Sequence, residues 1–381
     1  MIAVDRDPGA PGFRYADRRA IVSTEDEPGI ERLARAENVH GLIAPGIDWP
    51  VAIAARVAHR LALPHPISPE AAVLATSKVR QRVRFVEADV PQPEYVLCAG
   101  AEEALDAAER IGYPCVVKAP DRQGQRGLSL VRSRRDIARA VRHALAESRT
   151  ASVLVEELVP GREVTVNAFS LSGRFHPLTG TDRLVADPPA FGVALAHAWP
   201  SELPPRSIAG AIEAARAAAA AVGIENGPTY TQVLVTGEGD ARVGELAARL
   251  GGGHDAELCR VALGVDLNGA AIAAALGEDV PPPSLAPVAK VGGACVRFLV
   301  PRPGELRRVM GVEEASGLDG IRGVRIYRRP GHRFGQFRRG GDRAGAILAV
   351  GSSRDDALAK AERAAAMVKL ETAKPAPATA R

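Results

Sequence analysis

The chain has 381 residues, of which 46% are hydrophobic and 25% charged, and its formal net charge is +4. This length allows two or three packed units, and the composition is that of a globular protein. No apolar run approaches the roughly 18 residues of a membrane span, and the start carries no basic-then-apolar signal pattern. We therefore expect a cytoplasmic protein that does not associate with a membrane.

The first segment alternates short apolar strands with helical stretches. Strands are expected at 2–5, 21–23 and 41–44, and helices at 28–38 and 48–61. This order is typical of a small parallel sheet with helices between its strands. Three prolines, Pro64, Pro66 and Pro69, then mark a boundary, so we expect an N-terminal domain over 1–74.

Three further units and a tail are expected, over 75–152, 153–285, 286–371 and 372–381. Helices are expected at 76–88, 101–111, 134–148, 207–222 and 354–370, and strands at 115–118, 128–131, 153–157, 164–171, 231–236, 241–247 and 293–300. Gly223 is placed to end the fourth of these helices. The tail is rich in Ala, Pro and Lys, which predicts disorder.

The four cysteines are scattered, at Cys98, Cys115, Cys259 and Cys295, without the paired spacing of a metal site. They predict reduced, buried thiols and no zinc. Cys259 lies in an apolar helical stretch, which favours packing over a nucleophilic role.

A glycine-rich turn follows the strand that ends at Lys118. The turn, 121–127, contains two glycines, two arginines and polar residues, so its N–H groups and cations could surround a polyphosphate. A plain hairpin loop has the same composition. The turn matches neither a Walker A loop nor the GxGxxG fingerprint.

Acidic residues mark the next strand pair, at Glu156, Glu157 and Glu163. They are either exposed edge charges or hydrogen-bond partners for an adenine amine and ribose hydroxyls.

The most informative segment is a hairpin, 231–247, followed by Arg249 and three glycines. Pairing that is symmetric about the turn at 237–240 places Gln232 opposite Glu245. Opposed residues have Cβ atoms about 4.5–5.5 Å apart, so one cation could touch both side chains. A β-bulge would break this register. A carboxylate able to hold Mg²⁺ beside an arginine able to hold a substrate carboxylate suits chemistry between a nucleotide phosphate and an acid.

His254, which follows the three glycines, could touch a substrate, although such a histidine more often caps or packs.

Arginines are dense near the C-terminus: Arg322, Arg325, Arg328, Arg329, Arg333, Arg338, Arg339 and Arg343. The region lacks the aromatic platforms or groove-reading helix of nucleic-acid-binding proteins. We favour solvated hairpins, with an acidic substrate or an acidic carrier protein as the alternative.

Taken together, these motifs resemble the ATP-grasp superfamily over roughly 41–370. Their order is Ser77-Lys78, YPCVVKAP with a glycine-rich loop, VEELVPGREVTV, and a helix and hairpin that lead to GELAARLGGG. The later GDRAG motif, 341–345, looks most like the amino-acid-ligase branch. The resemblance implies an α/β ATP-grasp fold with an N-terminal parallel βα domain, a small ATP-lid subdomain and a C-terminal core.

The resemblance also implies roles for individual residues. For ATP these are Lys78, Lys118, the lid residues Gln123, Gly124, Gln125, Arg126 and Gly127, the adenine-site residues Glu156, Glu157 and Val159, and the ribose-binding Glu163. Glu245 and Gln232 would hold Mg²⁺ or Mn²⁺. Arg249 and Lys118 would be catalytic, and Arg249, Gly252 and His254 would contact the substrate.

Four departures from the superfamily pattern stand out. Gln232 replaces a second acid, Ala247 an asparagine and Tyr230 a frequent histidine. A glutamine oxygen can still bind Mg²⁺, which needs few protein ligands, so we expect weakened metal binding. Relatives begin with one more βα unit. Either this fold lacks that unit, or the true start lies upstream of Met1.

The expected function is an ATP-dependent ligase that joins a small-molecule carboxylate to an amine through an acyl phosphate, with an amino acid as one substrate. The resemblance leaves a homodimer open. One alternative is an ATP-grasp carboxylase that uses bicarbonate. The other is a degenerate ATP-grasp protein that binds a nucleotide or partner without turnover.

Overall fold

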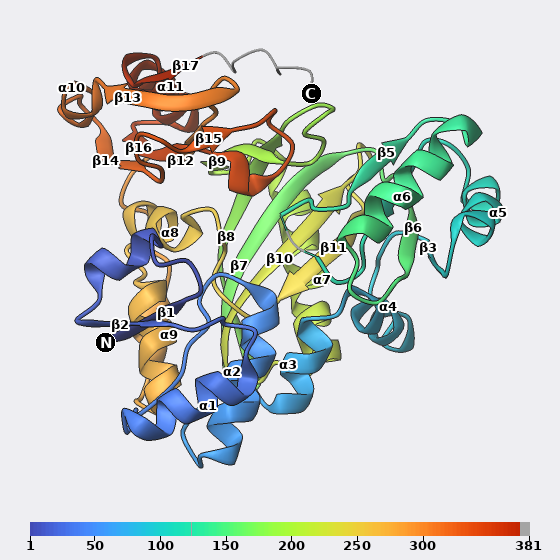
Figure 1. The fold of residues 1–381 in the computed structure, drawn as a ribbon, viewed down its shortest axis with the longest axis horizontal. Coiled ribbons are helices and arrows are strands. Elements are labelled where there is room, and N and C mark those ends of the chain that lie inside the picture. Colours follow the sequence, from blue (N-terminus) through green and yellow to red (C-terminus); the bar gives the residue numbers. More distant parts are fainter. Residues whose placement is uncertain (123, 374–381) are drawn as a thin grey trace, which may run out of the picture.

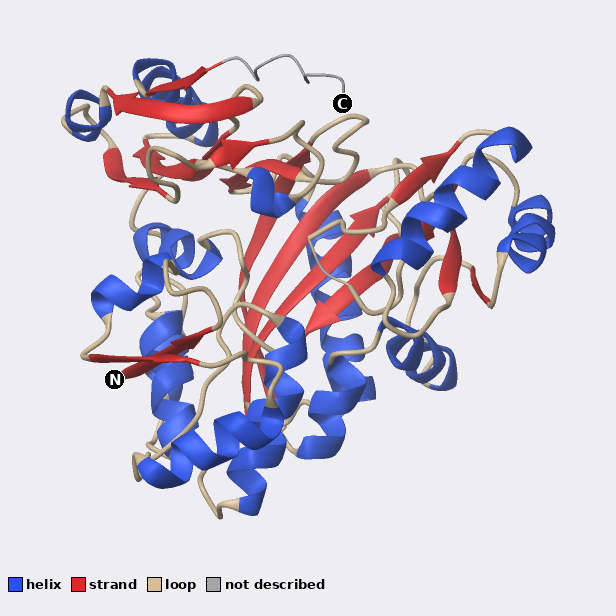
Figure 2. Ribbon diagram, in the orientation of Figure 1, coloured by secondary structure: helices blue, strands red, loops and turns tan. Residues whose placement is uncertain are grey.

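The computed structural model describes residues 1–122 and 124–373 (Figure 1). In this part of the chain the strands form four sheets, of two, four, eight and three strands. The largest sheet runs through the middle of the molecule, and the other sheets and the helices lie around it (Figure 2). The disorder expected for the tail concerns residues 374–381, which lie outside the described residues.

The N-terminal segment contains two parallel strands, β1 (Ile2–Asp5), as predicted, and β2 (Arg18–Ile21), which overlaps the strand predicted at 21–23 only at Ile21. The helices of this segment are η1 (Pro11–Tyr15, 3-10), α1 (Glu27–Ala36), α2 (Asp48–Arg60) and α3 (Pro69–Ala75). The strand predicted at 41–44 was wrong, since these residues form no strand. Gly41 instead lies against a later helix, where a Cβ atom would approach the Ala275 carbonyl oxygen to 2.2 Å.

The four-stranded sheet follows in the chain and is antiparallel throughout. Its strands, in spatial order, are β3 (Tyr95–Cys98), β6 (Val153–Glu157), β4 (Cys115–Lys118) and β5 (Ser129–Val131). The helices here are α4 (Lys78–Glu87), α5 (Ala101–Ile111), η2 (Arg134–Asp136, 3-10) and α6 (Ile137–Glu147). Alternate strand residues such as Val117 and Val155 share a core with α5 and α6, so the other face of the sheet is left for a site.

The eight-stranded sheet is also antiparallel between all neighbours. Its strands, in spatial order, are β11 (Ala241–Ala247), β10 (Gly227–Val235), β7 (Arg162–Leu171), β8 (Arg174–Val185), β9 (Ala194–Trp199), β12 (Gly293–Leu299), β16 (Gly345–Gly351) and β14 (Ile321–Ile326). The proposed boundaries after residues 74, 152, 285 and 371 stay predictions.

Helices cover this sheet through three separate cores. The helices are α7 (Pro205–Val222), α8 (Asp255–Leu263), α9 (Leu267–Leu276), α10 (Val312–Ser316) and α11 (Arg354–Met367). Helix α7 packs with α3 on the β7–β10–β11 part, while α8 and α9 pack on β12 and β16. Strand β12 alternates, because Val296 and Phe298 face α8 whereas Cys295 and Leu299 face α11. Helix α7 ends at Gly223, which is left-handed as predicted.

The three-stranded sheet completes the C-terminal part. Its strands are β15 (Arg333–Phe334), β13 (Gly304–Met310) and β17 (Lys369–Ala373). Two short 3-10 helices, η3 (Pro282–Leu285) and η4 (Gly340–Asp342), lie in the loops. The last helix ends at Met367, three residues earlier than predicted, and the chain continues into β17.

No single helix within residues 1–122 and 124–373 is long and apolar enough to cross a membrane. Helices α8 and α9 reach that length only as a pair, and they meet at 116°. The four cysteines are free and buried, as predicted, and Cys259 packs in the core beneath α8. Burial raises the pKa of its thiol to about 12.

Candidate functional site

A cleft of about 900 Å³ lies where the four-stranded sheet, the β10–β11 hairpin and residues 339–343 meet. Its lining includes most of the predicted site residues: Lys78, Lys118, Gly124, Gln125, Arg126, Glu156, Glu157, Val159, Glu163, Gln232, Glu245, Arg249 and Gly252. Gly127 and His254 are not in the lining, and Gln123 lies outside the described residues. The fold thus brings into one place residues that are up to 174 positions apart in the chain.

One wall of the cleft carries a buried triad of charges, Arg82, Lys118 and Glu156. Lys118 on β4 and Glu156 on β6 point to the sheet face opposite α5 and α6, since Val117 and Val155 occupy that core. One carboxylate oxygen of Glu156 lies 2.6 Å from Lys118 Nζ, and the other lies 2.9 Å from Arg82 Nε. Both oxygens are therefore engaged by cations.

These contacts set the protonation of the triad. Burial alone would raise the pKa of Glu156, but the charges of Arg82 and Lys118 outweigh it and lower the pKa from 4.5 to about 2. Burial lowers the pKa of Lys118, and Glu156 opposes that effect. Arg82 is held in place because its guanidinium also donates to the carbonyl oxygens of Val243 and Gly244, at 2.9 and 2.6 Å. Sequence reasoning missed Arg82, which is 74 positions from its carboxylate partner in the chain.

The facing hairpin has the predicted register. Gln232 pairs with Glu245, and Tyr230 with Ala247, on neighbouring strands β10 and β11. A bulge does occur, at Gly244, after which Val233 pairs with Val243. The pairs survive because the turn is also shifted by one residue, with Thr236 N donating to Asp240 O at 2.9 Å. The bulge and the shifted turn change the pairing by one residue in opposite directions, so the predicted pairs at 230–232 are retained.

Lys78 at the start of α4 contacts the hairpin carboxylate. Its Nζ lies 2.7 Å from Glu245 Oε1 and donates to the Arg122 carbonyl oxygen at 2.7 Å. Burial would raise the pKa of Glu245, but the charges of Lys78, Lys118 and Arg249 together outweigh it, so the pKa lies below its ordinary value. The side-chain nitrogen of Gln232 donates to Tyr230 Oη at 3.3 Å, which leaves its amide oxygen as a potential ligand.

Arg249 is fixed by a partner that the sequence did not reveal. Its Nε pairs with Asp48 at the first turn of α2, and its Nη1 donates to the Leu250 carbonyl oxygen at 2.8 Å. The guanidinium carbon also lies 5.7 Å from the centre of the Tyr230 ring. Burial lowers the pKa of Arg249, but the nearby acidic groups, Asp48 foremost and then Glu245, together raise it above its ordinary value. Asp48 belongs to the N-terminal segment, 201 positions away, so no local pattern could have indicated it.

A second group of charged residues, most of them buried, lies near Tyr230. Arg183 on β8 pairs with Glu163 on β7, the predicted ribose-binding acid. His197 Nδ1 lies 3.0 Å from Asp255 Oδ1, and both side chains are buried. His197 also explains a glycine of the GGG motif, because a Cβ at Gly253 would lie 2.4 Å from His197 Cε1.

The glycine-rich turn contributes to the lining of the cleft and contains three residues with positive φ. Gly124, Gln125 and Gly127 have φ values of +66°, +63° and +72°, a region that favours glycine. The Gly124 carbonyl oxygen accepts a hydrogen bond from Gly340 N at 3.3 Å, so the turn touches the C-terminal wall.

His254 does not line the cleft. It is the residue before α8, its Nε2 lies 2.6 Å from Tyr327 Oη and its Nδ1 lies 3.3 Å from Glu257 Oε1. In this structure it links the GGG turn to the β14 end.

Two family models match the chain. Residues 77–282 match the carbamoyl-phosphate synthase L chain, ATP binding domain, and residues 297–373 match the L-amino acid ligase C-terminal domain 2. A formate-dependent phosphoribosylglycinamide formyltransferase of Burkholderia pseudomallei is 28% identical over 393 residues, covering 97% of this chain and 89% of the relative. An uncharacterized protein, y4rH, of Sinorhizobium fredii is 27% identical over 340 residues, covering 87% of this chain and 68% of the relative.

Solved structures share the fold. An L-amino acid ligase from Bacillus licheniformis superposes with a TM-score of 0.81 at 19% identity, covering 94% of this chain and 88% of that one. A biotin carboxylase from Campylobacter jejuni, solved as a complex with an ATP analogue, gives 0.76 at 21% identity, covering 97% and 86%.

Proposed function

Because this chain belongs to the carbamoyl-phosphate synthase L chain ATP-binding family of the ATP-grasp superfamily, and its homologues are ATP-dependent ligases, we propose that it joins a carboxylate to an amine. The observation that carries the proposal is the cleft itself. Lys118 on the four-stranded sheet and Lys78 at the start of α4 line the same cleft as the hairpin carboxylate Glu245, and residues of the glycine-rich turn complete the lining.

The residues of the cleft fit Mg²⁺ and ATP. Lys78 and Lys118 are cations with little exposure, and the N–H groups and the single arginine, Arg126, of the turn at 124–127 suit a polyphosphate. Glu245 and the amide oxygen of Gln232 lie on paired residues, so they could share one hard cation, which takes oxygen ligands. Lys78 neutralises Glu245 in the structure described here. When nucleotide and metal bind, the metal would take over the contact with Glu245 and the Lys78 ammonium would contact a phosphate instead.

The proposed reaction has two steps. In the first step a carboxylate oxygen of the substrate attacks the terminal phosphorus of ATP, which forms an acyl phosphate and releases ADP. In the second step an amine attacks the acyl carbon, the bond between that carbon and the phosphate oxygen breaks, phosphate leaves, and the amine loses a proton. Bound Mg²⁺ would supply charge neutralisation at the phosphates. Arg249, fixed by Asp48, would hold the substrate carboxylate, and Lys118 would hold the transferred phosphate, so catalysis is mainly positioning and electrostatics.

One observation favours a second candidate, a nucleotide-binding protein without turnover. Gln232 supplies no charge where a second acid is common, and Ala247 supplies no polar group, so a metal would be held by fewer charges. The two candidates differ in one measurable quantity, the release of ADP.

An ADP-release screen across pairs of amino acids, with mass spectrometry of the products, tests the proposal. We expect ADP and a new amide for at least one pair. Glu245→Ala should lower turnover about a hundredfold or more, because a ligand of the metal is lost. Glu238→Ala, in the turn of the same hairpin, is the matched control and should be as active as the unmodified protein. Nucleotide binding without ADP release under any mixture would favour the second candidate.

A further inference from the structure

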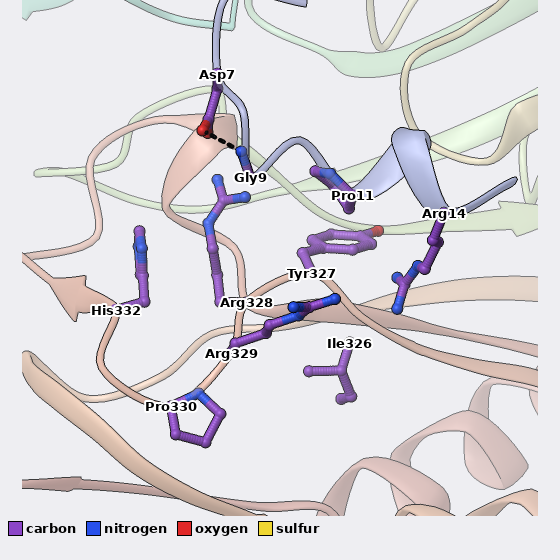
Figure 3. Close-up of a pocket in the computed structure, with 10 residues that line it drawn as sticks. All are labelled: Asp7, Gly9, Pro11, Arg14, Ile326, Tyr327, Arg328, Arg329, Pro330 and His332. Carbon is purple, nitrogen blue, oxygen red and sulfur yellow. Dashed lines mark hydrogen bonds between the residues drawn. The ribbon is translucent and has the colours of Figure 1, made fainter. Parts of the chain in front are cut away.

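A second pocket, of about 350 Å³, lies beside the cleft between residues 7–14 and 326–332 (Figure 3). It is lined by Asp7, Arg14, Arg328, Arg329 and His332, among others. Figure 3 shows the Tyr327 ring between the N-terminal segment and the arginines of the β14–β15 connection. Neither the family models nor the proposed reaction assigns a role to this pocket.

The charges of the pocket are unbalanced. Three guanidinium groups line it against one carboxylate, and none of the three forms an ion pair with an acid within the described residues. Asp7 Oδ1 instead accepts a hydrogen bond from Gly9 N at 2.8 Å. Arg328 Nε is buried without a hydrogen-bond partner in the described part of the chain, a state that costs free energy unless a ligand supplies an acceptor.

The pocket adjoins the cleft. Arg328 lines both, and the consecutive residues Arg6 and Asp7 line one each. Arg343 in the cleft also lacks an acidic partner among the described residues, and its guanidinium carbon lies 3.8 Å from the centre of the Phe298 ring. Burial, helped by the charge of Arg183, lowers the pKa of Arg343 to about 10. Arg328 Nη2 donates to the Gly341 carbonyl oxygen at 3.3 Å, so arginines without an acidic partner among the described residues line both the cleft and the pocket.

We propose that this pocket is an anion-binding extension of the cleft, which selects a substrate bearing a distal carboxylate or phosphate group. The proposal rests on the ligase function above, because the other end of that substrate would react near Arg249. Guanidinium groups bind both kinds of anion through paired hydrogen bonds. The pocket gives the C-terminal arginines a role as recognition elements for an acidic substrate.

The test compares L-glutamate and O-phospho-L-serine with L-glutamine by calorimetry, in the presence of Mg²⁺ and a non-hydrolysable ATP analogue. Glutamate and glutamine have nearly the same shape and differ in charge, so we expect glutamate or phosphoserine to bind at least about tenfold more tightly than glutamine. The tighter of the two anions identifies the group as a carboxylate or a phosphate.

Two variants locate the effect. The double substitution Arg14→Gln and Arg329→Gln changes exposed residues and should abolish most of the preference for the anion. Arg322→Gln, an exposed arginine of β14 outside the pocket, should retain it. Equal binding of the three amino acids, or a preference that survives the double substitution, would overturn the proposal. The binding measurement does not require turnover. A failed ADP screen would therefore overturn the ligase function, while the calorimetry would still show whether the pocket prefers an anion.

Discussion

At the scale of single residues, the site depends on charges that neutralise one another inside the protein. Glu156 is 4% exposed and contacts two cations, so removing it would leave Arg82 and Lys118 buried without their anion. Losing one partner of a buried ion pair commonly costs about 3–5 kcal/mol, whereas exposed pairs contribute about 0–1 kcal/mol. Glu156 is therefore expected to support the structure as well as the arrangement of Lys118.

We predict that Glu156→Gln lowers the free energy of unfolding at neutral pH by several kcal/mol. Glu109→Gln, which removes an exposed partner of Arg134, should change it little. The folded pKa of Glu156 lies below the unfolded value of 4.5, so its stabilisation is complete above pH 4.5 and is lost as the pH falls toward about 2. Urea unfolding between pH 7 and pH 2.5 measures this. A Glu156→Gln variant with the same pH dependence as the unmodified protein would contradict the assignment.

At the scale of elements, short apolar patterns predicted the strands that carry the site, whereas partners distant in the chain escaped prediction. Strands β4, β6 and β11 have the predicted bounds. Strand β11 lies in the alternating hairpin, while β4 and β6 are short apolar runs that end in charged residues. The apolar run 41–44 misled, since it packs against α9 without strand partners. Asp48 and Arg82 were missed because their roles arise only from tertiary contacts.

The GGG turn after β11 gives a prediction at this scale. A Cβ at Gly251 would lie 2.6 Å from Tyr230 Cδ2, and one at Gly253 would lie 2.4 Å from His197 Cε1. At Gly252 the nearest atom is 3.6 Å away, which is ordinary contact. Gly251→Ala and Gly253→Ala should therefore each cost about 1–3 kcal/mol, and Gly252→Ala much less. Thermal unfolding of the three variants checks this order. Equal losses of stability would show that the turn rearranges to accept a Cβ atom at each position.

At the scale of the whole molecule, the cleft is assembled from every major part of the chain. Asp48 links the N-terminal segment to Arg249, Lys78 links α4 to the hairpin, and Gly340 links the C-terminal part to the glycine-rich turn. Because these contacts surround one cleft, a ligand bound there would contact several parts of the chain at once. It would therefore stabilise their arrangement more than any one of these contacts does. A compound that binds only the folded protein stabilises it by about 2.7 kcal/mol at a hundred times its Kd.

This convergence predicts where a nucleotide acts. Addition of Mg²⁺ and a non-hydrolysable ATP analogue should slow amide hydrogen exchange in residues 124–128 and 339–343, since the two segments already meet through Gly124 and Gly340. Exchange in α1 and α5, which carry none of the cleft lining, should not change. Peptide-level mass spectrometry can resolve all four segments. Slower exchange in one of the two cleft segments without the other would mean that the nucleotide does not bridge them, and the proposed site for its phosphates would then be wrong.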